Sequence, residues 1–110
     1  MTYVPEQGDL IWLDFDPSSG KEIMKRRPAC VLSKKSFNAH TKMAVVAPVT
    51  STIRGIKLEV VLPKIIHTRG AILVYQLKSI DFTHRHAEFI EKLPPKIIEQ
   101  VLEIAQLILA

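Results

Sequence analysis

The hydrophobic pattern of the chain changes period once, near its C-terminal end, and this change restricts the possible folds more than any other feature. After Pro94 and Pro95, apolar residues recur three or four positions apart, at Ile97, Ile98, Val101, Leu102, Ala105, Ile108 and Leu109. Polar residues occupy positions between them, at Lys96, Glu99, Gln100, Glu103 and Gln106. Such a stripe is typical of an amphipathic helix. Pro95 is tolerated in the first helical turn because its missing N–H would have no partner there.

Before that helix, the chain consists of short apolar runs separated by turn residues. The runs are residues 9–15, 28–33, 43–50, 58–62 and 71–82. Their length and their β-branched and aromatic residues predict strands, the last run being one long strand or two linked ones. Pro48 must then lie at a sheet edge, at a bulge or near a strand end. Residues 34–41 are predicted as a short helix or an irregular crossover, capped by Ser33 or Ser36.

A succession of short strands followed by one helix predicts the α+β class. We expect a small, strongly curved antiparallel β-barrel with the C-terminal amphipathic helix packed on it. At 110 residues, the chain is expected to be one domain, 1–110, because it is too short to bury a second core. Residues 18–26 are small and charged without periodicity, and a loop of that length in a small domain is typical of a functional segment.

Composition narrows the class of protein further. With 47% apolar and 24% charged residues, the chain is expected to fold rather than remain disordered. Its apolar runs are far shorter than the roughly 20 residues of a membrane span, and its N-terminus lacks a signal-peptide pattern, so we expect a cytoplasmic protein. Cys30 is the only cysteine, which rules out an internal disulfide and predicts a buried, inert thiol. A net charge of +4 permits a polyanionic partner without demonstrating one.

Several sequence blocks, taken together, resemble those of one protein family. They are residues 8–17 (GDLIWLDFDP), Gly20-x-Glu22, residues 27–33 (RPACVLS), residues 46–51 (VAPVTS) and residues 76–80 (QLKSI). Their order and spacing resemble the MazF/PemK (Kid-like) toxins, the mRNA interferases of type II toxin–antitoxin systems, over nearly the whole chain. The resemblance implies an SH3-like barrel, a homodimer and cleavage of single-stranded RNA at short sequences, with inhibition of translation and growth. It also implies a cognate antitoxin, and an acidic disordered tail on that partner would neutralise the basic cluster at residues 21–27.

The resemblance assigns catalytic roles to Arg27, Thr50 and Glu22. RNA carries its own nucleophile, the 2′-hydroxyl, so the enzyme supplies a base, phosphate-stabilising donors and an acid, with no metal or cofactor required. Arg27 suits the phosphate because its planar donors stay charged, and Thr50 would bind it through its hydroxyl. Glu22 is the candidate base, and the products would be a 2′,3′-cyclic phosphate and a 5′-hydroxyl.

Two positions depart from the pattern of some relatives. Arg26 stands where these relatives carry a histidine before the motif arginine, and Tyr75 stands where they carry an acidic residue. Either a proton carrier is missing from this chain, or Glu22 and Arg27 suffice.

Further candidate RNA contacts lie near these blocks. They are Lys21, Lys25, Arg26, Ser51, Gln76, Lys78 and Ser79. On one continuous strand, Gln76 and Lys78 would share a face and Ser79 would point to the other. The alternative for this set is an ordinary polar surface.

The histidines invite a metal site, which the spacing does not favour. His84-x-His86 would place two imidazoles on one face of a strand, but a third and a fourth ligand at a suitable spacing are not evident. We therefore expect no metal. Two other functions compete with the ribonuclease: a gyrase-poisoning toxin of the CcdB type on a similar fold, and an RNA-binding barrel without catalysis.

Overall fold

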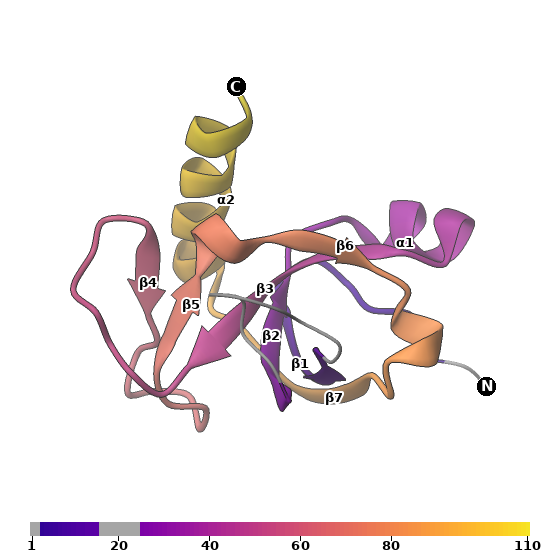
Figure 1. Cartoon of the computed structure of the whole chain (residues 1–110), viewed down its shortest axis with the longest axis horizontal. Coiled ribbons are helices and arrows are strands. Elements are labelled where there is room, and N and C mark those ends of the chain that lie inside the picture. The colour runs from indigo at the N-terminus through magenta and orange to yellow at the C-terminus, as the bar shows by residue number, and fades with distance from the viewer. Residues whose placement is uncertain (1–2, 16–24) are drawn as a thin grey trace.

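The computed structural model describes residues 3–15 and 25–110 (Figure 1). In chain order its elements are β1 (Asp9–Asp14), β2 (Arg26–Val31), α1 (Lys35–Thr41), β3 (Ala44–Thr50), β4 (Glu59–Val61), β5 (Ala71–Leu73), the 3₁₀ turn η1 (Val74–Gln76), β6 (Lys78–Ile80), the 3₁₀ turn η2 (Phe82–His84), β7 (Glu88–Lys92) and α2 (Pro95–Leu109). The predicted α+β class is confirmed. Residues 71–82 form two linked strands, with η1 between them.

All recorded strand pairs are antiparallel, and β3 is at the centre of the sheet. The order is β4-β5-β3-β2-β1-β7, with β6 paired to β3 beside that path. One edge of β3 pairs with β2, whereas the other pairs first with β6 and then with β5. Pro48 lies near the end of β3, between the residues that pair with β6 and those that pair with β5. Its missing N–H therefore interrupts no pairing with either of these two strands. Within the described ranges β4 and β7 do not pair with each other, so the strand pairs form a bent sheet and no closed barrel.

The sheet separates two groups of buried side chains, because successive residues of a strand point to opposite faces. The α2 face includes Leu10, Cys30, Leu32, Ala47, Val49, Ile72, Val101 and Ala105. The Phe15 face consists of Ile11, Leu13, Phe15, Ala29, Val31, Ala44, Val46, Ile80 and Phe82. Each fully buried aliphatic side chain contributes about 1.5 to 3 kcal/mol. Cys30 is fully buried, as predicted, and burial raises the pKa of its thiol to about 12.

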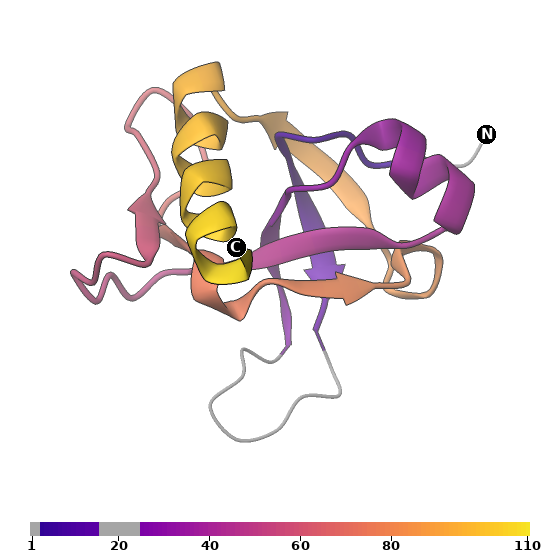
Figure 2. The same ribbon diagram turned by 90° about the horizontal axis from the view of Figure 1, so that it is seen from above.

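Helix α2 confirms the C-terminal amphipathic helix. It begins at Pro95, and Val101 and Ala105 are its buried residues. Its last turn leaves Leu107 and Leu109 more than two-thirds exposed, at 77% and 72%. Figures 1 and 2 both show α2 and α1 at opposite ends of the sheet. None of the helices in the described part of the chain is long and apolar enough to span a membrane.

Helix α1 begins without the predicted serine cap. Lys34 occupies the cap position and makes no side-chain cap bond. The Ser33 hydroxyl instead donates to Asn38 Oδ1 at 2.6 Å and accepts from the Val45 N–H at 2.8 Å. Ser36 lies inside the helix, where it cannot cap the start. The cap prediction is therefore wrong, because the Ser33 hydroxyl joins α1 to β3.

Asn38 gives the first testable prediction. Its fully buried amide donates to the Pro5 and Ser33 carbonyls, at 2.9 and 3.2 Å, besides accepting from the Ser33 hydroxyl. Asn38→Ala leaves these buried groups unpaired, so we expect a loss of about 2 to 3 kcal/mol in the free energy of unfolding, measured by urea denaturation. The exposed His40→Ala on the same helix serves as the control and should stay within about 0.5 kcal/mol of the parent protein. An unchanged midpoint for Asn38→Ala would contradict this account.

Candidate active site

The register of the central strands places Arg27 and Thr50 on the same side of the sheet. Arg27 on β2 pairs with Leu13 on β1, and the β2–β3 pairs end at Ala29 and Pro48. Continued by two residues, that antiparallel register sets Arg27 opposite Thr50. By alternation, Arg27 shares its side of β2 with Ala29, and Thr50 shares its side of β3 with Val46. Both residues therefore lie at the margin of the Phe15 face, and Thr50 is only 4% exposed.

Thr50 is held in place by its neighbours. Its hydroxyl accepts a hydrogen bond from the Thr52 N–H at 3.2 Å, and its backbone pairs with Ala71 on β5. Gly70 packs so closely against it that an added Cβ would lie 2.1 Å from the Thr50 carbonyl oxygen. Gly70 also has a φ of +119°, a backbone conformation that residues with a side chain rarely adopt. A hydroxyl both donates and accepts, so the Thr52 contact is compatible with donation to a phosphate oxygen.

Lys78 joins the same face, whereas the other residues predicted near it do not. Lys78 pairs with Val46, and its Nζ lies 5.9 Å from the centroid of the Phe15 ring. Ser79 is exposed on the opposite face, as predicted. Gln76 is not on that strand: it belongs to η1, and its amide nitrogen lies 3.4 Å from the Tyr75 hydroxyl. The prediction that Gln76 and Lys78 share a strand face is wrong because the chain turns between β5 and β6.

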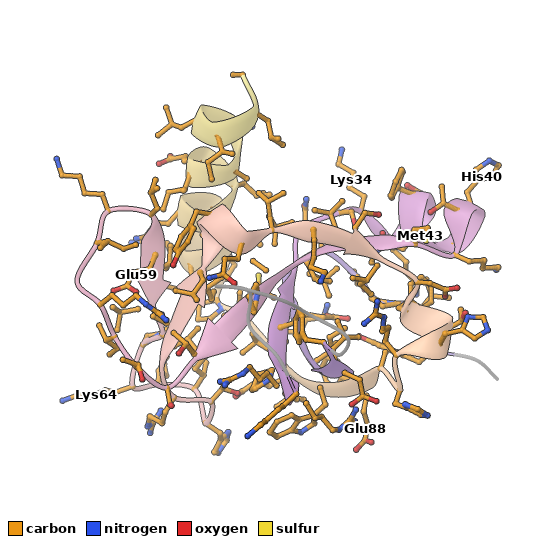
Figure 3. All side chains as sticks on the ribbon, in the orientation of Figure 1. Lys34, His40, Met43, Glu59, Lys64 and Glu88 are labelled. Carbon is orange, nitrogen blue, oxygen red and sulfur yellow. The ribbon has the colours of Figure 1, made fainter. Side chains whose placement is uncertain are left out.

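The loop after Thr50 contains another candidate, Ser51. Ser51 is exposed at the start of residues 51–58. The carboxylate of Glu59, which is 8% exposed, accepts from the backbone N–H groups of Arg54 and Gly55, with the Gly55 bond at 2.6 Å. Figure 3 shows Glu59 beside this loop. The loop that carries Ser51 is thus fastened to the start of β4.

Arg26 lies in β2 rather than in the predicted loop, and Asp14 and Glu88 bind it. Its guanidinium contacts Asp14 Oδ1 at 3.1 Å and Glu88 Oε1 at 3.4 Å. The other oxygen of Asp14 contacts His86 Nδ1 at 2.7 Å. The hydrogen bonds from His86 and then Arg26 hold the pKa of Asp14 below its usual value. Glu88 lies far from Lys34 and His40 on α1 (Figure 3).

These contacts join the two strands at the base of the segment between β1 and β2. The Phe15 N–H also donates to the Lys25 carbonyl at 3.0 Å. Lys25 is exposed, with a φ of +71°. The predicted base Glu22 and its neighbour Lys21 lie outside the described residues.

Three of the histidines contact separate carboxylates. His84 contacts Asp81 at 2.7 Å, His86 contacts Asp14, and His67 contacts Glu91 at 3.4 Å. Residues 3–15 and 25–110 contain no group of three or more His, Cys, Asp or Glu side chains that could hold a metal ion.

Glu91 on β7 is a structural residue that the sequence did not reveal. Its carboxylate accepts from the Thr68 N–H at 2.8 Å, the Thr68 hydroxyl at 2.7 Å and the His67 N–H at 3.1 Å. Burial alone would raise the pKa of Glu91, but the hydrogen bonds from Thr68 and His67 outweigh it and lower the pKa to about 2. Glu91 thereby fixes the turn before Gly70, the residue that packs on the Thr50 backbone. Only a long-range contact reveals this role, because 23 positions separate Glu91 from Thr68.

Comparison with known proteins assigns this arrangement to a family. The family described as PemK-like, MazF-like toxin of type II toxin–antitoxin system matches residues 6–109. The endoribonuclease toxin MazF of Escherichia coli K12 is 45% identical over 85 residues, covering 77% of this chain and 76% of that protein. Endoribonuclease PemK of Escherichia coli is 32% identical over 101 residues, covering 88% and 76%.

Solved structures agree with the sequence relatives. MazF from Deinococcus radiodurans superposes with a TM-score of 0.94 at 36% identity, covering 98% of both chains. A MazE–MazF structure from the same organism gives a TM-score of 0.87 at 36% identity, covering 98% of this chain and 97% of that one. The fold is that of the MazF-like toxins. The chain belongs to the PemK-like, MazF-like family and is a MazF-type endoribonuclease toxin.

Glu91 provides the second prediction, a dependence of stability on pH. Because the folded-state pKa of Glu91 is depressed, its contribution is present above about 4.5 and is lost as the pH falls towards about 2. Glu91→Gln should therefore lower the urea midpoint at neutral pH, and its difference from the parent protein should shrink through that window. Glu103→Gln, an exposed change on α2, is the control. A difference that stays constant across the window would show that the charge of Glu91 is unimportant.

Proposed function

We propose that this toxin cuts single-stranded RNA by attack of the RNA's own 2′-hydroxyl on the neighbouring phosphate. The observation that carries this proposal is the placement of Arg27 and Thr50 at one margin of the Phe15 face. A guanidinium and a hydroxyl on one side of a phosphate stabilise the charge that develops as the 2′-oxygen bonds to phosphorus. The close packing of Gly70 on the Thr50 backbone fixes the strand end that carries the hydroxyl.

Each proton has a donor and an acceptor in this scheme. Glu22 takes the proton of the 2′-hydroxyl, the bond from phosphorus to the 5′-oxygen breaks, and solvent water protonates the departing oxygen. The products are a 2′,3′-cyclic phosphate and a 5′-hydroxyl. Arg26 takes no part in proton transfer, because a guanidinium does not lose its proton in proteins and its donors contact Asp14 and Glu88.

RNA binding extends the site along the same face. Lys78 is the best supported of the additional contacts, because it lies on the Phe15 face with Arg27 and Thr50. Lys21, Lys25 and Ser51 are further candidate phosphate contacts in this proposal. Gln76, which lies in η1, and Ser79, which lies on the opposite face of β6 from Lys78, are weaker candidate contacts.

A second copy of the chain is the partner we propose for α2. A groove of about 400 Å³ runs between α2 and the sheet, and its apolar lining is Leu32, Val45, Leu77, Leu102, Ala105 and Leu109. Leu109, in the last turn of α2, is exposed and extends this lining to the surface. A contiguous apolar surface of this kind is characteristic of a protein interface. A symmetric pair of α2 helices would cover it and give a homodimer.

The remaining partner is a cognate antitoxin. The Deinococcus radiodurans relative was solved in complex with MazE. In this chain, the basic residues between positions 21 and 27 carry positive charge that would attract an acidic disordered tail. We infer that such a tail blocks RNA access, and that the toxin acts in the cytoplasm as a single domain spanning residues 1–110.

Removal of Arg27 is the third prediction. Arg27→Ala should lower cleavage of a long single-stranded RNA by about 100-fold or more, because one donor to the transition-state charge is lost. The assay contains a chelator, and the cyclic-phosphate ends are identified by mass spectrometry. Lys34→Ala, which removes a cation near α1, should cut at the parent rate. Full activity of Arg27→Ala would refute its role, whereas RNA binding without cutting, or trapped gyrase on DNA, would refute the ribonuclease.

The homodimer gives the fourth prediction. Leu109→Lys places a charge in the apolar groove, so we expect the protein to sediment as a monomer at concentrations where the parent is a dimer. Leu107→Lys is the matched control, because Leu107 is equally exposed and does not line that groove. A monomeric parent protein, or two variants that behave alike, would contradict the proposed interface.

A further inference from the structure

Trp12 is an exposed indole in the middle of a buried strand. Its neighbours on β1, Ile11 and Leu13, are fully buried, whereas Trp12 is 39% exposed. It pairs with Pro28 on β2 and Glu88 on β7. By alternation it points to the opposite side of the sheet from Phe15. Trp12 therefore lies outside the Phe15 face, which carries the proposed catalytic residues.

The indole borders a cavity of about 370 Å³ that carries polar groups at its rim. The cavity is lined by Trp12, Pro28, His67, Thr68, Arg69 and Ile90. The apolar lining offers a stacking surface beside an imidazole and a guanidinium, whereas the Thr68 hydroxyl already donates to Glu91. This combination suits a nucleobase and its phosphate better than a purely apolar anchor.

Arg69 is the permanent cation among the side chains that line this cavity. Arg69 donates through Nη1 to the Ile66 carbonyl and forms no ion pair with a carboxylate in residues 3–15 or 25–110. Glu91 holds two of the lining residues, since it accepts from Thr68 and His67. Arg69 is therefore the lining group that can attract a phosphate.

The cavity adjoins the catalytic pair at two points of the chain. Pro28 follows Arg27 directly, so their Cα atoms are about 3.8 Å apart. Arg69 precedes Gly70, whose backbone packs on the Thr50 carbonyl. Because Arg27 and Pro28 point to opposite faces of β2, an RNA strand that contacts both must pass around the end of that strand.

We propose that the Trp12 cavity binds one nucleobase of the RNA strand next to the scissile phosphate. The base stacks on the indole, and Arg69 binds the adjacent phosphate. Stacking on an aromatic side chain is tolerant of base identity, whereas the polar rim offers hydrogen bonds that distinguish bases. The proposal rests on the proposed ribonuclease function and adds to it a subsite that helps to set which sequences are cut.

The chain provides its own probe, because Trp12 is its only tryptophan. Tryptophan emission of the full chain is followed as a random pool of short 2′-O-methylated RNA, which lacks the attacking hydroxyl, is added. A fluorescent label on the RNA reports total binding. We expect the pool to quench Trp12, and an oligomer with the same backbone but no bases to bind without quenching. RNA that binds with no change in Trp12 emission would overturn the proposal, as would quenching by poly-glutamate but not by RNA.

Variants test the same subsite through cleavage. Trp12→Leu should raise KM about tenfold, leave kcat near the parent value and change the base preference at one position beside the cut. Trp12→Phe keeps a ring and should restore most of the affinity. Phe37→Leu removes an exposed aromatic ring on α1 and should change neither constant. Circular dichroism confirms that each variant is folded, and Trp12→Leu with parental KM and base preference would overturn the proposal.

The two failures are distinguishable. If RNA is cut but the Trp12 emission does not change with RNA and Trp12→Leu leaves KM unchanged, the subsite proposal is wrong and the ribonuclease proposal is retained. If base-dependent quenching of Trp12 is seen but no RNA is cut, the subsite proposal is retained and the catalytic proposal is wrong.

Discussion

The antiparallel pairing of β3 with its neighbours is the constraint on which the rest of this structure depends. One edge of β3 holds β2 in register, and the other holds β6 and then β5. The first pairing sets Arg27 towards Thr50, and the second brings Lys78 to the same face. Because a slip of one residue would turn every side chain to the opposite face, the two buried groups and the candidate site require the same register.

Close packing then turns this arrangement into a fixed site. Gly70 contacts the Thr50 backbone so tightly that no side chain fits between them. Glu91 anchors the preceding turn through Thr68, so β7 contributes to the position of Thr50 without approaching it. At the other side, Asp14 joins β1, β2 and the segment before β7 through Arg26 and His86. The bound phosphate would thus meet groups whose positions are already determined.

Much of the fold could be predicted from local pattern, and much of the site could not. The period of three to four residues after Pro95 predicted α2 because burial of one helix face is a local property. The change of strand partner was not visible, so Gln76 was placed on a strand with Lys78 when it lies in a turn. Gly70 and Glu91 were missed because their roles depend on residues 20 or more positions away. Arg27 and Thr50 were found only through the family motifs, since neither residue type is distinctive alone.

The central claim is that Arg27 and Thr50 act on the same phosphate, and a double-mutant cycle tests it most directly. The rate of single-turnover RNA cleavage is measured for the parent protein, Arg27→Ala, Thr50→Val and the double variant. Groups that share one transition state are coupled, typically by about 0.5 to 3 kcal/mol. We predict that the double variant is much less impaired than the product of the two single losses. Losses that multiply in full would show that the two residues act independently and would contradict the account.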